Sequence, residues 1–502
     1  MSTLRSSTVP DVLRRTAARV PGRTALRFGD RAWTYAELDA AVSRAARRLL
    51  DLGLRHGDRV AAYGRNSDAY LIGFLACARA GLVHVPVNYN LVGGELAYLV
   101  EQSGSRVALV DPALRGNVDE LGLELEHVLP LRDADGSLLD SARAGDVPAL
   151  DVEVADTDLA QLLYTSGTTS RPKGAMMTHR ALVHEYVSCI VGLDLTEHDD
   201  PLHVMPLYHS AQMHVFLLPW LAVGATNTLV EAPDPADILR RLAADRHGAF
   251  FAAPTLWVAL ANHPEFGERD LSALRKAYYG ASIMPGPVLE RLQAAMPDLG
   301  FYNCFGQSEI GPLATILGPA EHATRPDSAG RAVLFVELRV VDAEGRDVAP
   351  GEQGEVVYRS PQLALGYWDK PEETAEAFRD GWFHSGDLVR VDEEGYLYVV
   401  DRIKDVINTG GVLVASREIE DALYTHPAVG EVAVVGLPDE KWIEAVTAVV
   451  VPKERVGEEE LIEHARGTLS SFKVPKSVRF VDDLPRNASG KILKRELRDR
   501  LA

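Results

Sequence analysis

A short loop of hydroxyl side chains carries the clearest chemistry in this sequence. Residues 164–174 read Y-T-S-G-T-T-S-R-P-K-G. Backbone N–H groups and short hydroxyls can surround an anion, and Lys173 adds a positive charge suited to phosphate oxygens. A buried strand is expected over residues 159–164 and a helix from about His179, an arrangement in which α/β folds bind phosphate. The sequence therefore predicts a phosphate-binding loop rather than a polar surface turn.

The loop is not a Walker A sequence. That pattern requires G-x-x-x-x-G-K-[ST], whereas here Lys173 precedes Gly174 and no Ser or Thr follows the lysine. The identity of the phosphate ligand therefore depends on other motifs.

A second polar motif, at residues 303–309, could bind a base and a metal. It reads N-C-F-G-Q-S-E. Asn303 could hydrogen-bond the amide edge of a purine, and Phe305 could cover its face. Glu309 supplies the oxygen ligand that Mg²⁺ prefers. Taken alone, a polar loop after a strand explains the motif equally well, but the phosphate loop favours the functional interpretation.

Four weaker signals fit a nucleotide and acid site. Residues 280–282 (G-A-S) follow an expected strand, and small residues there let a planar base approach. Asp387, in an S-G-D tripeptide, could bind two vicinal ribose hydroxyls, although such a tripeptide is more often a turn. Lys491 follows a glycine near the C-terminus, where a lysine is usually only solvated. His209, in M-P-L-Y-H-S, stands alone, and a lone histidine is more often structural.

Together these motifs resemble those of the adenylate-forming superfamily, which includes acyl-CoA synthetases, aryl-CoA ligases, luciferases and peptide-synthetase adenylation domains. They occur in the family's order and at similar spacing, and the resemblance covers nearly the whole chain. Ser170 is a departure, because the family usually has glycine there. Gln307 and Ser308 stand where a hydroxyl pair is common.

The resemblance implies a role for each matching residue. Lys491, His209 and Glu309 would be catalytic, and Glu309 would also bind Mg²⁺. Lys404 would be the hinge between two domains, and Gly410-Gly411 would border the CoA tunnel. The other implied contacts are Thr165, Ser166, Gly167, Thr168, Thr169, Lys173 and Ser308 to the phosphates of ATP; Gly280, Ala281, Ser282, Asn303, Cys304, Phe305, Asp387 and Arg402 to adenine and ribose; and His209, Ser210, Trp257 and Gly306 in the acyl pocket.

The reaction that the resemblance implies is the ATP-dependent activation of a carboxylic acid. The carboxylate attacks the α-phosphate, pyrophosphate leaves, and the thiol of CoA then attacks the acyl-AMP to give an acyl-CoA thioester. Both reactants of the first step are anions, so catalysis depends on positioning and charge neutralisation. No side-chain nucleophile is needed. ATP, Mg²⁺ and CoA are the expected cofactors.

The expected acid is neutral, and bulky or of medium to long apolar chain. Gly306 stands where acetate-specific relatives carry a tryptophan that shortens the pocket. Residues 210–216 and 251–257, the expected pocket segments, contain no Lys or Arg. A second carboxylate on the substrate is therefore disfavoured.

Two alternatives stay open. Leu413 stands where many relatives have Asn beside the CoA tunnel, so the acyl group could pass to a carrier protein or a separate enzyme instead of CoA. An alternative of another class is a catalytically silent nucleotide-binding scaffold. The presence of Lys173, Glu309, Asp387 and Lys491 argues against a silent scaffold.

Composition limits the class of protein. The chain has 502 residues and a net charge of −20, which disfavours nucleic acid or an anionic membrane as the main partner. A site for ATP must therefore gather its own positive charge. The three cysteines are far apart in sequence, so no disulfide framework or zinc site is expected, and a cytoplasmic monomer or homodimer fits. The N-terminus has no signal-peptide pattern, and the apolar run 215–223 is too short to span a bilayer.

The elements that must position these residues alternate between helices and strands. Thr34 and Glu37 form a capping box, which predicts that a helix begins there. Strands are expected over residues 59–63 and 83–87, with a helix over 71–80 between them. This alternation predicts an α/β fold with largely parallel sheets.

A change of pattern towards the C-terminus predicts further parts. Strands over residues 333–341 and 355–359 indicate a β-rich subdomain. A charged segment and a glycine pair near residues 400–411 then lead into a small α/β region. The predicted domains are a large N-terminal adenylation domain, residues 1–402, and a small mobile C-terminal domain, residues 403–502, which carries the catalytic lysine.

Overall fold

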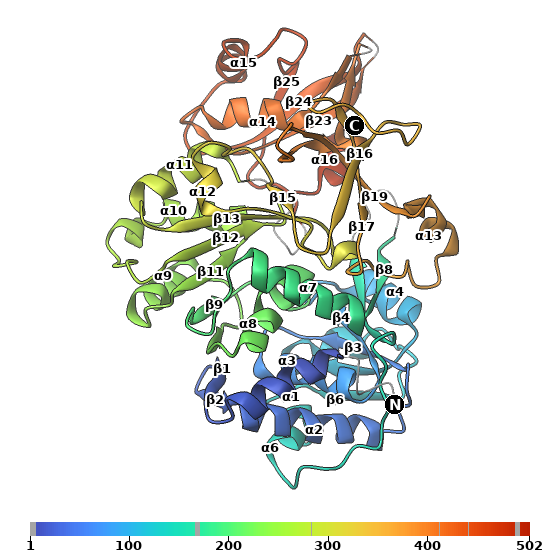
Figure 1. The fold of residues 1–502 in the computed structure, drawn as a ribbon. Coiled ribbons are helices and arrows are strands. Elements are labelled where there is room, and N and C mark those ends of the chain that lie inside the picture. The colour runs from blue at the N-terminus through green and yellow to red at the C-terminus, as the bar shows by residue number, and fades with distance from the viewer. Residues whose placement is uncertain are drawn as a thin grey trace.

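The computed structural model describes residues 7–165, 171–282, 284–410, 412–439, 441–486 and 492–501. The predicted fold class is confirmed: a large N-terminal α/β part with mainly parallel sheets, a β-rich subdomain and a smaller C-terminal part (Figure 1). The boundary at residue 402 stays a prediction.

The first sheet carries the predicted phosphate loop at its edge. All its neighbouring strands are parallel except the last pair, β7 and β8. Its strands, in spatial order, are β6 (His127–Pro130), β5 (Ser105–Val110), β3 (Arg59–Tyr63), β4 (Val83–Val87), β7 (Leu159–Thr165) and β8 (Lys173–Thr178).

The second sheet carries the motif at residues 303–309. Its five inner pairings, from β13 to β1, are parallel, and the strands at both edges are antiparallel. Its strands, in spatial order, are β15 (Arg331–Ala332), β14 (Thr315–Leu317), β13 (Gly300–Phe305), β12 (Lys276–Gly280), β11 (Ala249–Ala252), β9 (Pro201–His203), β10 (Asn227–Leu229), β1 (Thr24–Phe28) and β2 (Arg31–Thr34).

Two smaller sheets complete the fold. The β-rich subdomain is antiparallel and contains β16 (Glu337–Val341), β17 (Gln353–Arg359), β18 (Phe378–Arg379), β19 (Trp382–Val391) and β20 (Leu397–Arg402). The C-terminal sheet contains β21 (Ile407–Thr409), β22 (Val412–Val414), β23 (Val429–Asp439), β24 (Ile443–Pro452) and β25 (Ser477–Phe480), with helices α14 (Ser416–Tyr424), α15 (Glu458–Arg466) and α16 (Lys494–Leu501). Figure 1 shows this part, in orange and red, at the end of the molecule opposite helices α1 (Val9–Arg19) and α2 (Tyr35–Asp51).

Local sequence signals place several helices. The Glu37 N–H donates to Thr34 Oγ1 (3.2 Å) and the Thr34 N–H donates to Glu37 Oε2 (2.8 Å), so the predicted capping box begins α2. Helix α3 (Asp68–Arg79) begins three residues before the expected start, because Ser67 Oγ accepts the Tyr70 N–H and acts as the N-cap.

The expected order of strand, phosphate loop and helix is wrong in one respect. Strand β8 lies between the loop and helix α7 (His179–Gly192), and it pairs antiparallel with β7. The loop therefore joins two strands of a hairpin and does not lead into a helix N-terminus. Of the described residues at the two ends of this loop, Thr165 and Lys173 are the ones predicted to bind phosphate.

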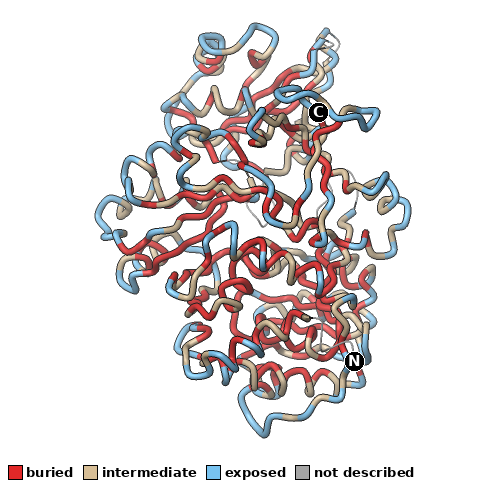
Figure 2. The backbone as a smooth tube through the Cα atoms, in the orientation of Figure 1, coloured by how far each residue is buried: buried red, intermediate tan, exposed pale blue. Residues whose placement is uncertain are grey.

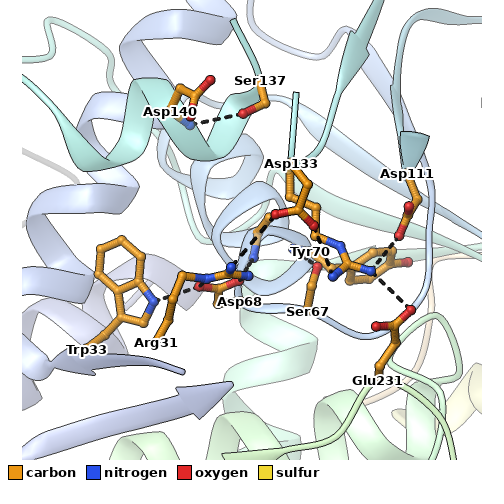
Figure 3. A network of polar contacts seen from close by, with 12 residues as sticks. Arg31, Trp33, Ser67, Asp68, Tyr70, Asp111, Asp133, Ser137, Asp140 and Glu231 are labelled. Atoms are coloured by element: carbon orange, nitrogen blue, oxygen red, sulfur yellow. Dashed lines mark hydrogen bonds and ion pairs between the residues drawn. The ribbon is translucent and has the colours of Figure 1, made fainter. Parts of the chain in front are cut away.

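Buried residues run along the inner strands of the sheets (Figure 2). Polar groups join the two large sheets at their margin (Figure 3). The buried Asp68 accepts hydrogen bonds from Arg31 (2.8 Å) and Trp33 Nε1 (2.9 Å). Arg132 pairs with Asp111 at 3.0 Å and with Glu231 at 3.2 Å, which ties the end of β5 to the segment after β10.

The three cysteines are unpaired and buried. Within the described ranges, no helix combines the length and hydropathy that a bilayer crossing requires.

Candidate active site

A cavity of about 400 Å³ lies where the predicted motifs meet. Thr165 ends β7 and Lys173 begins β8, so the hairpin places both at its rim. Gly306, Ser308 and Glu309 follow β13. The other predicted residues that line this cavity are His209, Ser210, Gly280, Ala281, Cys304, Phe305, Arg402 and Lys404.

Three cations gather at this cavity although the whole chain is acidic. Lys173, Arg402 and Lys404 all line it. The Lys173 Nζ lies 5.1 Å from the centre of the Tyr367 ring. Burial lowers the pKa of Lys404, and the charges of Arg402 and Lys173 lower it further, against the pull of two carboxylates. An anion placed among these groups would relieve their mutual repulsion.

Glu309 ends the motif at residues 303–309, and two hydroxyl groups hold its carboxylate. It belongs to a single helical turn, η5 (Ser308–Ile310), and its Oε1 accepts hydrogen bonds from Thr165 Oγ1 (3.2 Å) and the Tyr367 hydroxyl (3.0 Å). Mg²⁺ is usually held by one or two carboxylates together with substrate phosphates and water. The described part of the chain has no cluster of three or more His, Cys, Asp or Glu that could hold a metal. One buried carboxylate beside a phosphate site therefore fits Mg²⁺ that arrives with ATP.

Two glycines lie where no side chain fits. A Cβ added to Gly306 would lie 2.0 Å from the carbonyl oxygen of Pro312, and its φ of +154° also disfavours other residues. A Cβ on Gly280 would lie 2.2 Å from the carbonyl oxygen of Cys304. Both clashes are with backbone: Gly280 allows β12 to lie close to the end of β13, and Gly306 allows the segment after β13 to lie close to Pro312.

His209 and Ser210 line the same cavity as Thr165 and Lys173. The Ala211 N–H donates to His209 Nδ1 (3.3 Å), which leaves the ring proton on Nε2. Burial lowers the pKa of His209 to about 4, so the ring is neutral at pH 7. The Ser210 and Ser308 hydroxyls are 2.9 Å apart and link this segment to the Glu309 turn.

Asp387 and Arg402 form an ion pair beside a second cavity. Arg402 Nε lies 2.5 Å from Asp387 Oδ1, and Asp387 is almost fully buried. This cavity, of about 360 Å³, shares Arg402, Phe305 and Gly306 with the first and extends between the subdomain and the C-terminal part. Ala281, Ser282, Asn303 and Cys304 also line it. The adenine and ribose candidates are thus adjacent to the phosphate candidates.

Asn303 and Gly410 have protein partners in this structure. The Asn303 amide nitrogen donates to the Ser328 carbonyl at 3.0 Å. The Gly410 N–H donates to the Trp442 carbonyl, and Gly410 has a φ of +65°. These contacts hold Asn303 and Gly410 in place within the fold.

Trp257 does not line either cavity, so its assignment to the acyl pocket stays a prediction without support from this geometry. Trp257 is buried in the core against Phe250 and Phe301, and its Nε1 donates to the Tyr278 carbonyl at 3.1 Å. On helix α10 (Pro254–Asn262), Trp257 faces the core, while other residues of the helix line the second cavity. Six other candidates lie outside the described residues: Ser166, Gly167, Thr168, Thr169, Gly411 and Lys491.

Several residues that line the cavity were assigned no role from the sequence, among them Tyr367, Tyr208 and Gln307. Tyr367 bonds Glu309, and its neighbours pair with β8 through hydrogen bonds from Met176 N to Gly366 O (2.9 Å) and from Trp368 N to Gly174 O (2.8 Å). Within the described residues, the Tyr208 hydroxyl and Gln307 Nε2 are buried without a hydrogen-bond partner, and both residues line the cavity. Buried unpaired polar atoms are uncommon, which marks these two as candidates for ligand contact.

Comparison with known proteins identifies the family. Residues 13–368 match the model of the AMP-binding enzymes, and residues 418–491 match that of the AMP-binding enzyme C-terminal domain. The chain is 41% identical over 488 residues to a feruloyl-CoA synthase from an Amycolatopsis species, with 97% of each chain covered. It is 35% identical over 505 residues to the fatty acid–[acyl-carrier-protein] ligase ScoC of Streptomyces coeruleorubidus, covering 96% and 94%.

A solved structure agrees over the whole length. The anthranilate CoA ligase AuaEII in complex with anthranoyl-AMP superposes with a TM-score of 0.92 at 26% identity, covering 98% of this chain and 97% of that one. The chain belongs to the family of AMP-binding enzymes. Within it, the predicted class is confirmed: this is an AMP-forming acid–thiol ligase of the acyl-CoA synthetase type.

Proposed function

We propose that this enzyme activates a neutral, bulky carboxylic acid, with an aromatic acid as the first choice, and transfers the acyl group to CoA. One observation carries the proposal: a single cavity joins three cations and Glu309 to an apolar wall of Val215, Phe216, Phe251 and Leu313. The charged part suits ATP, and the apolar part suits the body of an uncharged acid. The relatives named for feruloyl-CoA and anthranilate support an aromatic ring.

In the first step a carboxylate must approach a polyphosphate, and the two anions repel each other. The cations at the cavity reduce this repulsion. In our proposal Lys173 and Thr165 bind the leaving pyrophosphate, together with the hydroxyls of residues 166, 168 and 169. Lys491 neutralises charge that develops between the carboxylate and the α-phosphate. Such fixed charges act most strongly where water is excluded.

Glu309 is the proposed Mg²⁺ ligand. The metal, when bound with ATP, would supply charge neutralisation at the phosphates. Thr165 and Tyr367 hold the carboxylate through its Oε1, which fixes the direction in which Oε2 points. Ser308 supports the turn through its contact with Ser210.

His209 is the proposed contact for the carboxylate of the acid. Its neutral ring carries the proton on Nε2 and can donate a hydrogen bond without adding a charge. A positive histidine here would hold the carboxylate in its ground state too tightly to favour attack. The catalytic and acyl-pocket roles that the family resemblance implies for His209 are compatible with this contact.

Asp387 is the proposed ribose ligand, with Arg402 holding its carboxylate in place. Gly280, Ala281 and Ser282 would form the shelf for adenine, and Phe305 would cover its other face. Lys404, at the start of the C-terminal part, is the proposed hinge. Gly410 and Gly411 would border the CoA tunnel after the domain rotation.

A pyrophosphate-release screen across acids, with and without CoA, tests the proposal. Aromatic and bulky neutral acids should give pyrophosphate with ATP alone, and CoA should increase the turnover and yield a thioester. Preference for acetate or for a dicarboxylic acid would contradict the substrate assignment. Absence of pyrophosphate with every acid would contradict the activity itself and favour a silent scaffold.

A carrier protein is the second candidate acceptor. Leu413 is 71% exposed, and Val412 on the same strand and Ile443, which pairs with Thr409 on the neighbouring strand β21, are also exposed. An apolar surface at the predicted CoA tunnel suits protein contact better than the polar groups of CoA, and one relative is named a ligase for an acyl carrier protein. Acyl-AMP that persists with CoA but disappears with a pantetheine-bearing carrier protein would favour this acceptor.

A further inference from the structure

One wall of the acid end of the cavity is a π-helix. It spans η3 (Ala211–Leu217), and the Leu218 N–H donates to the Met213 carbonyl, five residues earlier. Ala211, Val215 and Phe216 from this segment line the cavity. π-helices are rare and frequently lie at functional sites. The forces that hold this segment therefore bear on the shape of the pocket.

The sequence explains in part why the segment is not an ordinary α-helix. Pro219 has no N–H and cannot bond the Val215 carbonyl four residues earlier, and its ring would clash with that carbonyl. It lies in the first turn of α8 (Leu218–Val223), where no N–H is needed. Pro219 thus interrupts an α-helix but does not by itself fix the wider turn before it.

Gln212 anchors the segment on one side. It is buried, its Oε1 accepts the Met205 N–H (3.0 Å), and its Nε2 contacts His203 Nδ1 (2.8 Å). His203 Nε2 in turn contacts Asn227 Oδ1 at 2.9 Å, and Asn227 donates to the Ala25 carbonyl at 3.1 Å. This chain ties the π-helix to three neighbouring strands, β9, β10 and β1.

His214 anchors the segment to the other large sheet. Its Nε2 contacts Gln161 Oε1 on β7 (2.7 Å), and its Nδ1 contacts the Tyr186 hydroxyl on α7 (2.9 Å). The Gln161 amide nitrogen contacts His84 Nδ1 on β4 at 2.9 Å. His214 also stacks on the Tyr186 ring, with centres 6.0 Å apart.

One set of proton positions satisfies both chains. An amide nitrogen can only donate and an amide oxygen can only accept, so His203 and His214 must each carry one proton, on Nε2. Burial lowers the pKa of His214 to about 3 and that of His203 to about 4, so both rings are neutral in the working pH range. Each contact is then a directed hydrogen bond, and both anchors fix the rotation of the helix about its axis.

We propose that Gln212 and His214 are positioning residues that hold Ala211–Leu217 as a π-helix and thereby set which acids fit the cavity. The proposal rests on the proposed function, since it takes the wall formed by Val215 and Phe216 as part of the acid site. If either anchor is lost, the segment can tighten towards an α-helix, in which each N–H bonds the carbonyl four residues earlier instead of five. That change would rotate Val215 and Phe216 relative to His209.

The test uses two variants that keep a flat ring or an unbranched chain but cannot form the hydrogen bonds, His214→Phe and Gln212→Met. Each leaves buried partners unpaired, and such losses correspond to roughly tenfold effects. The relative kcat/KM values across a series of acids of graded size should change by about that factor, while the KM for ATP changes less than about twofold. Tyr35→Phe is the matched control, because it loses one buried hydrogen bond, to the Ala225 carbonyl, away from the cavity.

Three outcomes would overturn the proposal. In the first, both variants lower the rate equally with every acid. The Tyr35→Phe control would show the same pattern if losing a buried hydrogen bond only destabilised the fold. In the second, the KM for ATP rises as much as the KM for the acid. In the third, crystal structures of both variants retain the π-helix. The third readout needs no turnover, so it separates failure of this proposal from failure of the proposed function.

Discussion

Glu185 allows a sharp test of the packing behind the active site. It is fully buried on α7, where its Oε1 accepts the Leu313 N–H at 2.9 Å and the Cys189 thiol at 3.3 Å. Gln362 donates to its Oε2 and also bonds the carbonyls of Ile310 (3.2 Å) and Leu313 (3.1 Å). Glu185 and Gln362 together therefore hold the turn that follows Glu309.

Burial raises the pKa of Glu185 from its ordinary value of 4.5 to about 8, although hydrogen bonds from Leu313 and Cys189 oppose the rise. In the folded protein this carboxyl is therefore neutral at pH 7, while in the unfolded chain it is ionised. Between these two pKa values the folded state binds a proton that the unfolded chain does not. The contribution of Glu185 to the free energy of unfolding is therefore fully present below pH 4.5 and is lost as the pH rises to about 8. The rise in pKa corresponds to roughly 5 kcal/mol at its upper bound.

The perturbation is Glu185→Gln, which removes the titrating group and keeps its size. The free energy of unfolding of the wild type should fall by roughly 1.4 kcal/mol per pH unit relative to the variant between pH 5 and 8. The variant amide also faces the Gln362 amide nitrogen as a donor, so it should be the less stable protein at pH 5. The difference should shrink or reverse by pH 9.

Urea denaturation at pH 5, 7 and 9 measures this difference. Glu459→Gln is the control, because Glu459 is exposed at the start of α15 and has the same chemistry without burial. Parallel pH profiles for the wild type and Glu185→Gln would refute the reasoning, since they would mean that Glu185 titrates alike in the folded and unfolded chains.

Three further predictions concern the site itself. Asp387→Ala should raise the KM for ATP at least tenfold more than the KM for the acid, because the ribose hydroxyls lose a charge-assisted contact; an unchanged dependence of the rate on ATP would count against the ribose role. Lys491→Ala should abolish pyrophosphate release but largely spare thioester formation from supplied acyl-adenylate. Equal loss of both half-reactions would contradict the proposal that the C-terminal domain takes one orientation for adenylation and another for thioester formation. Gly306→Ala should destabilise the fold by about 1–3 kcal/mol and impair turnover, because its Cβ would meet the Pro312 carbonyl at 2.0 Å; a thermal melt matching the wild type would show that the turn can move.

Elements marked by local chemistry could be predicted from the sequence. The capping box at Thr34 placed α2, and the alternation of apolar strands and helices gave the fold class. Strand β8 was missed because residues 171–178 begin with R-P-K-G, a pattern typical of a loop. Its strand conformation comes from pairing with β7 and with residues 366–368, and such non-local pairing leaves no local signal.

Residues of the candidate site could be predicted where they belong to a contiguous motif. They could not be predicted where tertiary packing determines which side chains line the cavity. Whether Trp257 meets the cavity could not be read from the sequence, because α10 has apolar residues on most of its faces and periodicity does not show which face meets the cavity. Tyr367 was missed because it reaches Glu309 only through the pairing of its loop with β8. Gln212 and His214 were missed because a π-helix has no sequence pattern that the helical or strand period reveals.

The distribution of charge around the cavity bears on the choice of acid. In the described part of its lining, Lys173, Arg402 and Lys404 stand near Glu309, and Arg402 is already paired with Asp387. In our proposal these cations, Lys491 and Mg²⁺ are all taken up by ATP and the reacting carboxylate, so the described lining has no further cation for a second carboxylate. The apolar wall of Val215, Phe216 and Phe251 offers no partner for one either, and an unpaired buried charge is strongly unfavourable. We therefore expect the site to select against dicarboxylic acids, because its described lining offers no positive charge beyond what ATP requires.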